Sequence, residues 1–187
     1  MAVESTKRRF TADEYMRMAE TGILAPEDRV ELIEGEIVTM STPGPHHCAA
    51  VDRATRTMIL TLGERALVRV QGTVRLNLFN MPQPDLVLLC PRSDFYATAH
   101  PAGADILLVV EISDTTIRYD RTVKGPMYAR LGVHEYWIVD VNAETVFRHS
   151  RPKSATYREV SSFTRGQRLS PELLPDWSIA VDDLLAE

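Results

Sequence analysis

The chain has 187 residues, of which 44% are hydrophobic and 25% charged, and its net charge is −5. This length and composition predict one globular domain over residues 1–187. The acidic balance argues against a surface coated for nucleic acid, although the arginine-rich stretches 53–75 and 148–168 form either a local basic face or ordinary solvated faces. Cys48 and Cys90 form no disulfide or zinc pattern and suit a reducing cytoplasm, and no apolar run reaches the ~18 residues of a membrane span.

The first half of the chain predicts a helix, a hairpin, a second helix and a strand region. A capping-box pattern starting at Thr11 begins the first helix, which ends at Gly22. Residues 30–40 surround a Glu-Gly pair and predict a β-hairpin. An apolar stripe at helical spacing predicts a helix over residues 46–62, and β-branched residues predict one or two strands over residues 67–78.

The second half predicts two buried strands, a helix and three further strands. Continuous runs of Leu, Val and Ile within residues 84–90 and 106–113 are typical of strands covered on both faces. Pro126 fits only the first turn of a helix or a kink, so we expect the regular part of the next helix to begin near residues 122–124 and to end at Gly132. Further strands are predicted over residues 135–141, 145–148 and 157–163, and a short final helix within residues 173–185.

This order of elements predicts the class of fold. It indicates a mixed α/β (α+β) domain with a central mixed sheet, helices on its faces, and an N-terminal helix and hairpin. Trp137 and Trp177 are interpreted as core anchors and not as surfaces for stacking bases.

Each of the two buried strands carries one acid. Asp85 stands at the start of the first strand and Glu111 near the end of the second. A buried, unpaired carboxylate is costly, so these acids require a partner, and on neighbouring strands they can meet at one place. Hard oxygen ligands select Mg²⁺ or Mn²⁺. The alternatives are that Asp85 bonds loop amides and that Glu111 pairs with an arginine such as Arg118.

Lys124 is the best candidate for a protein cation beside these acids. It lies near the predicted start of the helix that follows Glu111. An ammonium group there would stabilise negative charge that develops on a phosphoryl group, and a helix N-terminus also favours phosphate. Tyr128 follows at i+4 on the same helix face, where it packs in the core, orients the lysine or touches DNA.

Several segments match a known pattern in the order in which they occur. They include Pro84-Asp85 and Glu111-Ile112-Ser113, and they extend to residues 31–36 (Glu-Leu-Ile-Glu-Gly-Glu) and 132–140 (Gly-Val-His-Glu-Tyr-Trp-Ile-Val-Asp). Together these segments resemble the PD-(D/E)XK nuclease superfamily, and in particular its Uma-two family of restriction endonuclease-like proteins.

The resemblance implies a restriction-endonuclease-like fold and a Mg²⁺- or Mn²⁺-dependent endonuclease that hydrolyses DNA phosphodiester bonds. It implies that Asp85 and Glu111 bind the metal, together with the carbonyl group of Ile112. Ser113 stands where the superfamily pattern has a lysine. In this family the lysine has moved to the following helix, where Lys124 matches its position.

Three other residues are assigned roles near this site. Glu31 matches a family position and is either a further catalytic acid near the metal or a polar residue on an exposed strand face. His47 lies at the mouth of the second helix, where it touches the site or a phosphate, caps the helix or faces solvent. Asp120 is expected to cap or precede the following helix.

The expected partners are DNA and a second copy of the chain in a homodimer, with no membrane and no organic cofactor. The alternative is a catalytically weak or inactive nuclease-fold module that binds DNA or protein, which Ser113 and the acidic net charge favour. A purely structural dimerisation domain is a third possibility. Convergence of Glu31, Asp85, Glu111 and Lys124 on one open pocket distinguishes the nuclease from these alternatives.

Overall fold

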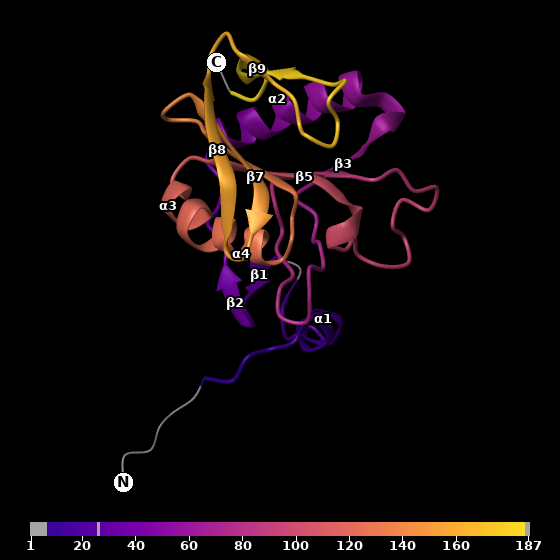
Figure 1. The fold of residues 1–187 in the computed structure, drawn as a ribbon. Helices are drawn as coiled ribbons and strands as arrows, with labels where there is room; N and C mark the ends of the chain where they lie inside the picture. Colours follow the sequence, from indigo (N-terminus) through magenta and orange to yellow (C-terminus); the bar gives the residue numbers. More distant parts are fainter. Residues whose placement is uncertain (1–6, 26, 186–187) are drawn as a thin grey trace.

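A six-stranded sheet forms the centre of the protein, as seen in a computed structural model that describes residues 7–25 and 27–185 (Figure 1). Its strands β5 and β6 are parallel and the other neighbours are antiparallel, which confirms the predicted mixed sheet. In order across the sheet they are β3 (Leu67–Val70), β4 (Leu86–Leu89), β5 (Ile106–Ser113), β6 (Glu135–Asp140), β7 (Thr145–Lys153) and β8 (Thr156–Thr164).

Different elements cover the two faces of this sheet. Helix α2 (Pro45–Leu62) and the C-terminal segment lie on one face, and a hairpin and the helices after β5 lie on the other (Figure 1). Side chains alternate between the faces, so Leu86 and Leu88 of β4 pack towards α2, whereas Val87 and Leu89 pack towards the hairpin side. Every residue of β4 is buried, as its apolar run predicts.

The N-terminal elements agree with the sequence prediction. Thr11 caps α1 (Ala12–Glu20) in a capping box with Glu14. The hairpin pairs β1 (Val30–Ile33) with β2 (Glu36–Thr39). A pair of hydrogen bonds between Leu32 and Met81 joins β1 to the chain just before Asp85.

The strand predicted over residues 67–78 is shorter in the structure. Strand β3 ends at Val70, and the next residue, Gln71, has a φ of 44° that no strand can accommodate. The chain then runs to Pro84 without a helix or a regular strand. Within this segment, isolated bridges pair Met81 with Leu32 and Asn77 with Asn80. Of the valines in this stretch, Val68 and Val70 lie in β3, whereas Val74 lies beyond the end of the strand and is buried.

The helical segment after β5 also begins earlier than residues 122–124. It comprises α3 (Ile117–Tyr119), a π-helical turn over Asp120–Lys124, and α4 (Gly125–Arg130). The regular helix α4 begins at Gly125, next to the predicted start, and Pro126 lies in its first turn as predicted, whereas α3 and the π-helical turn before it were not predicted.

The π-helical turn has a local cause. Pro126 lacks the N–H that an α-helix directs to the carbonyl group four residues earlier, so the regular ladder cannot pass through it. The N–H of Gly125 instead donates to the carbonyl of Asp120, five residues back. The wider turn carries both Asp120 and Lys124 as buried residues.

The C-terminal segment closes the α2 side of the core. Trp137 and Trp177 are both buried there, as predicted. The predicted final helix is only a single 3-10 turn over Val181–Asp183, preceded by a short pair of β9 (Arg168–Leu169) with β10 (Ile179–Ala180). Within the described ranges, no helix has the length and apolar character needed to cross a membrane.

Candidate active site

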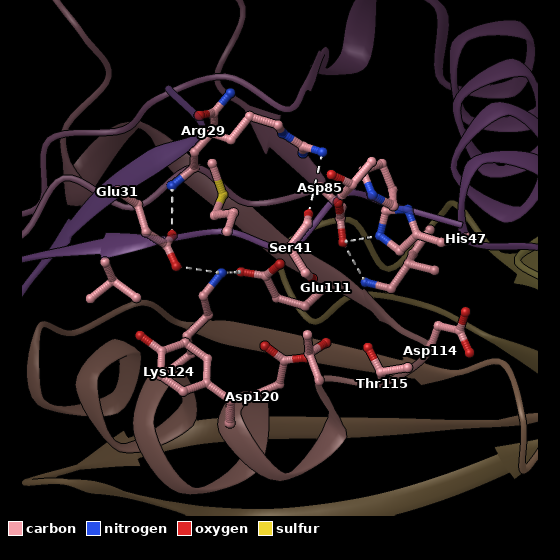
Figure 2. Close-up of a pocket in the computed structure, with 18 of the residues that line it drawn as sticks. Arg29, Glu31, Ser41, His47, Asp85, Glu111, Asp114, Thr115, Asp120 and Lys124 are labelled. Carbon is pink, nitrogen blue, oxygen red and sulfur yellow. Dashed lines mark hydrogen bonds and ion pairs between the residues drawn. The ribbon is translucent and has the colours of Figure 1, made fainter. Parts of the chain in front are cut away.

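Asp85 and Glu111 lie at the same end of two neighbouring antiparallel strands. Leu86 of β4 pairs with Val110 of β5, so the residue before Leu86 and the residue after Val110 are close in space. Alternation places both acids on the hairpin side of the sheet. Both line a cavity of about 510 Å³ (Figure 2). Residues of the hairpin, the N-terminus of α2 and the π-helical turn form its other walls.

Glu111 is almost completely buried and is held by two donors. Lys124 Nζ lies 2.9 Å from its Oε1, and the Tyr128 hydroxyl donates to the same oxygen over 3.0 Å. Burial raises the pKa of Glu111 above its ordinary value; the ammonium of Lys124 opposes this shift, and neighbouring carboxylates reinforce it. The pairing with Arg118 considered above does not occur.

Asp85 is held in an ionised form by three donors from different elements. The N–H of Ile112 donates to Oδ2 over 2.9 Å, His47 Nε2 lies 3.1 Å from the same oxygen, and the Gln71 side-chain amide donates to Oδ1 over 3.3 Å. Burial alone would raise the pKa of Asp85, but His47 and the amide donors hold it below its ordinary value. Asp85 thus bonds a backbone amide, as one alternative stated, and also faces the cavity.

Lys124 lies between two carboxylates. Its Nζ is 2.9 Å from Glu111 Oε1 and 3.3 Å from Glu31 Oε1 (Figure 2). Burial by itself lowers the pKa of Lys124, but the surrounding charges of Glu111, Glu31 and Asp120 raise it above the ordinary value. Lys124 therefore carries a positive charge at any physiological pH.

Ser113 and Asp120 form a second, smaller network beside the cavity. The Ser113 hydroxyl donates to Asp120 Oδ2 over 2.6 Å, and the Thr116 hydroxyl donates to the same oxygen over 2.7 Å. Ser113 is fully buried and does not line the cavity, whereas Asp120 does. At the position where the superfamily pattern has a lysine, this chain therefore has a hydroxyl that anchors the π-helical turn.

The cavity has the donor set of a divalent-cation site. Mg²⁺ is ordinarily bound by one or two carboxylates, and water and substrate phosphates complete its coordination shell. Asp85 and Glu111 can supply the two carboxylates. Across residues 7–25 and 27–185, no three His, Cys, Asp or Glu side chains converge as a complete metal centre. The carboxylates that line the cavity are Glu31, Asp85, Glu111, Asp114 and Asp120, against the permanent cations Arg29 and Lys124.

The four residues whose convergence was in question therefore meet at one cavity. Glu31, Asp85, Glu111 and Lys124 all line it, together with His47 and Ile112, while Tyr128 supports Glu111 from the core. Glu31 is only 2% exposed, so its alternative placement on an exposed strand face is wrong.

Sequence reasoning missed two glutamines and underestimated one acid. Gln71 binds the Asp85 carboxylate, and the Gln83 N–H binds Glu31. Asp120 lines the cavity, although it was expected only to cap the helix. The position of Gln83, two residues before Asp85, is the one signal that could have drawn attention to it.

The fold and site together define a class of protein. A central mixed sheet with helices on its faces carries two acids, Asp85 and Glu111, that line one cavity. The sequence model of the Uma2 family, described as "Putative restriction endonuclease", matches residues 12–182, and the chain belongs to this family. Membership confirms the resemblance drawn from the sequence.

One solved structure supports the fold. It is described as a "putative nuclease belonging to DUF820" from Anabaena variabilis; it superimposes with a TM-score of 0.70 at 17% sequence identity, over 94% of this chain and 97% of that one. No curated protein sequence matches the chain. The family relation thus makes this a nuclease-type protein.

Proposed function

We propose that the protein is a Mg²⁺- or Mn²⁺-dependent endonuclease that hydrolyses phosphodiester bonds of DNA. The observation that carries the proposal is the position of Lys124, whose ammonium lies 2.9 Å from Glu111 although a serine replaces the lysine of the superfamily pattern. A displaced lysine that still reaches the second acid supports a working site, since the position of the charge matters and not the element that carries it.

Asp85 and Glu111 would hold the metal, and the carbonyl group of Ile112 is the third proposed ligand. When bound, the cation would polarise the phosphodiester and lower the pKa of a water ligand. Asp85 contributes an oxygen that is ionised at neutral pH, because His47 and Ile112 hold its pKa below the ordinary value against the effect of burial. The hydrogen bonds to Tyr128 and Ile112 fix both carboxylates in orientation before any ligand arrives.

Lys124 would stabilise the negative charge that develops on the phosphoryl oxygens. Its raised pKa makes it a fixed cation and excludes it as the base that accepts a proton from water. A homodimer, which would place two such sites on the two strands of a duplex, remains a prediction. So does a cytoplasmic location.

The test is cleavage of supercoiled, linear and single-stranded DNA by purified protein, alongside calorimetric titration with Mg²⁺ and Mn²⁺. The proposal expects metal-dependent cleavage that is lost in Asp85→Ala. Glu135→Gln is a matched control, because Glu135 is a fully buried glutamate on β6 that does not line the cavity. Intact DNA in every form, together with no metal binding, would favour the inactive binding module instead.

A further inference from the structure

Glu31 and Glu111 approach Lys124 from different elements. Glu31 comes from β1 of the hairpin, and Glu111 comes from the central strand β5. Figure 2 shows the Lys124 ammonium between the two carboxylates, with one contact to each. Lys124 is thus shared between Glu111, which is proposed to bind the metal, and Glu31, which comes from the hairpin.

The position of Glu31 is fixed by the protein around it. Its Oε1 contacts Lys124 at 3.3 Å, and its Oε2 accepts the N–H of Gln83 over 3.2 Å. Paired backbone hydrogen bonds of 3.2 and 2.8 Å between Leu32 and Met81 hold this part of the hairpin against the segment that leads to Asp85. Both carboxylate oxygens of Glu31 therefore already have protein donors.

We propose that Glu31 is a positioning residue that holds the Lys124 ammonium in the site, and that it is not a metal ligand. This inference rests on the proposed function and assigns the role of one residue within it. It also replaces the earlier expectation that Glu31 is a catalytic acid beside the metal.

The reason lies in competition for Glu111. Lys124 and Tyr128 both bind Oε1 of Glu111. A cation bound to Glu111 repels the ammonium and takes over its carboxylate, so Lys124 needs a second anion that the metal does not share. Glu31 meets that need, because its Oε1 lies 3.3 Å from the Lys124 ammonium and its Oε2 is held by the N–H of Gln83.

A kinetic cycle separates this role from metal binding. We expect Glu31→Gln to lower kcat by about 10- to 100-fold with little change in KM, as is typical when the partner of an active-site group is removed. In a Lys124→Met background the same change should cost less than about threefold, because a residue that acts through Lys124 has nothing left to position. Glu135→Gln, which removes a buried carboxylate outside the cavity, should leave kcat unchanged. An equal loss in both backgrounds would overturn the proposal.

A crystal structure of the wild-type protein soaked with Mn²⁺ gives a second readout that needs neither activity nor a stable variant. The expected anomalous peak lies on Asp85 and Glu111, with the Glu31 oxygens beyond the usual ligand distance of about 2.0–2.6 Å and still in contact with Lys124. Mn²⁺ bound directly by Glu31 would overturn this inference and leave the proposed function standing. Absence of Mn²⁺ from Asp85 and Glu111 would overturn both.

Discussion

Replacement of Lys124 by methionine removes the central charge of the site while it keeps most of the side-chain volume. The ammonium makes two contacts with carboxylate oxygens, at 2.9 and 3.3 Å, and all three side chains are at least 93% buried. Each pair contributes roughly 5 kcal/mol of attraction at an effective dielectric constant of about 20, which the cost of desolvation largely offsets. Lys124→Met leaves these carboxylates buried without their cation, which should lower the free energy of unfolding by about 3–5 kcal/mol.

For a chain of this size, that penalty lowers Tm by roughly 6–20 °C, because each kcal/mol is equivalent to about 2–4 °C. If Mg²⁺ binds at Asp85 and Glu111 as proposed, it supplies part of the missing positive charge, so we expect it to raise Tm more in Lys124→Met than in the wild-type protein. DNA cleavage should fall by about 10²–10³-fold even at saturating Mg²⁺.

Differential scanning calorimetry with and without Mg²⁺ measures the stability effect. Lys153→Met is the matched control, since Lys153 is exposed at the end of β7 and should change neither Tm nor cleavage. A Tm for Lys124→Met within about 2 °C of the wild-type value would refute the buried ion pairs, because it corresponds to less than about 1 kcal/mol.

Three further substitutions test other parts of the molecule. Tyr128→Phe removes the hydroxyl that donates to Glu111 over 3.0 Å, and it should lower the free energy of unfolding in urea by about 1.5–3 kcal/mol. A loss below about 0.5 kcal/mol would argue against that hydrogen bond. Gly35→Ala should destabilise by more than about 1 kcal/mol, because Gly35 has a φ of +79° and an added Cβ would lie 2.7 Å from the Arg9 side chain; an unchanged Tm would contradict the hairpin turn. Burial lowers the pKa of His149 below its ordinary value of 6.5, so near that pH the imidazole takes up a proton more readily in the unfolded chain than in the folded protein. The stability of the fold should therefore fall as the pH drops below about 6.5, and His149→Gln should make the Tm–pH profile flatter in that range.

The sequence predicted those parts of the fold that local chemistry determines. The capping box at Thr11 and the Glu34-Gly35 turn appear as expected, because side-chain hydrogen bonds and positive φ angles are local properties. The two central strands were recognisable because burial on both faces requires unbroken apolar runs.

The remainder depended on contacts between distant segments. The π-helical turn arises from the position of Pro126 within a helix whose start is not evident in the sequence. The Gln71 side chain reaches Asp85 only because the chain leaves β3 at a positive φ angle. Lys124 was a candidate because it lies near the start of the helix after Glu111, and the family pattern supported it; periodicity alone gives no reason to bury a lysine.

The most direct test of the central claim is the rate at which a supercoiled plasmid is nicked, compared between wild type and Asp85→Ala in parallel preparations. EDTA should suppress nicking by the wild-type protein, excess Mn²⁺ should restore it, and Asp85→Ala should remain inactive in both conditions. Equal nicking by the two proteins, or nicking that persists in EDTA, would contradict a metal site built on Asp85.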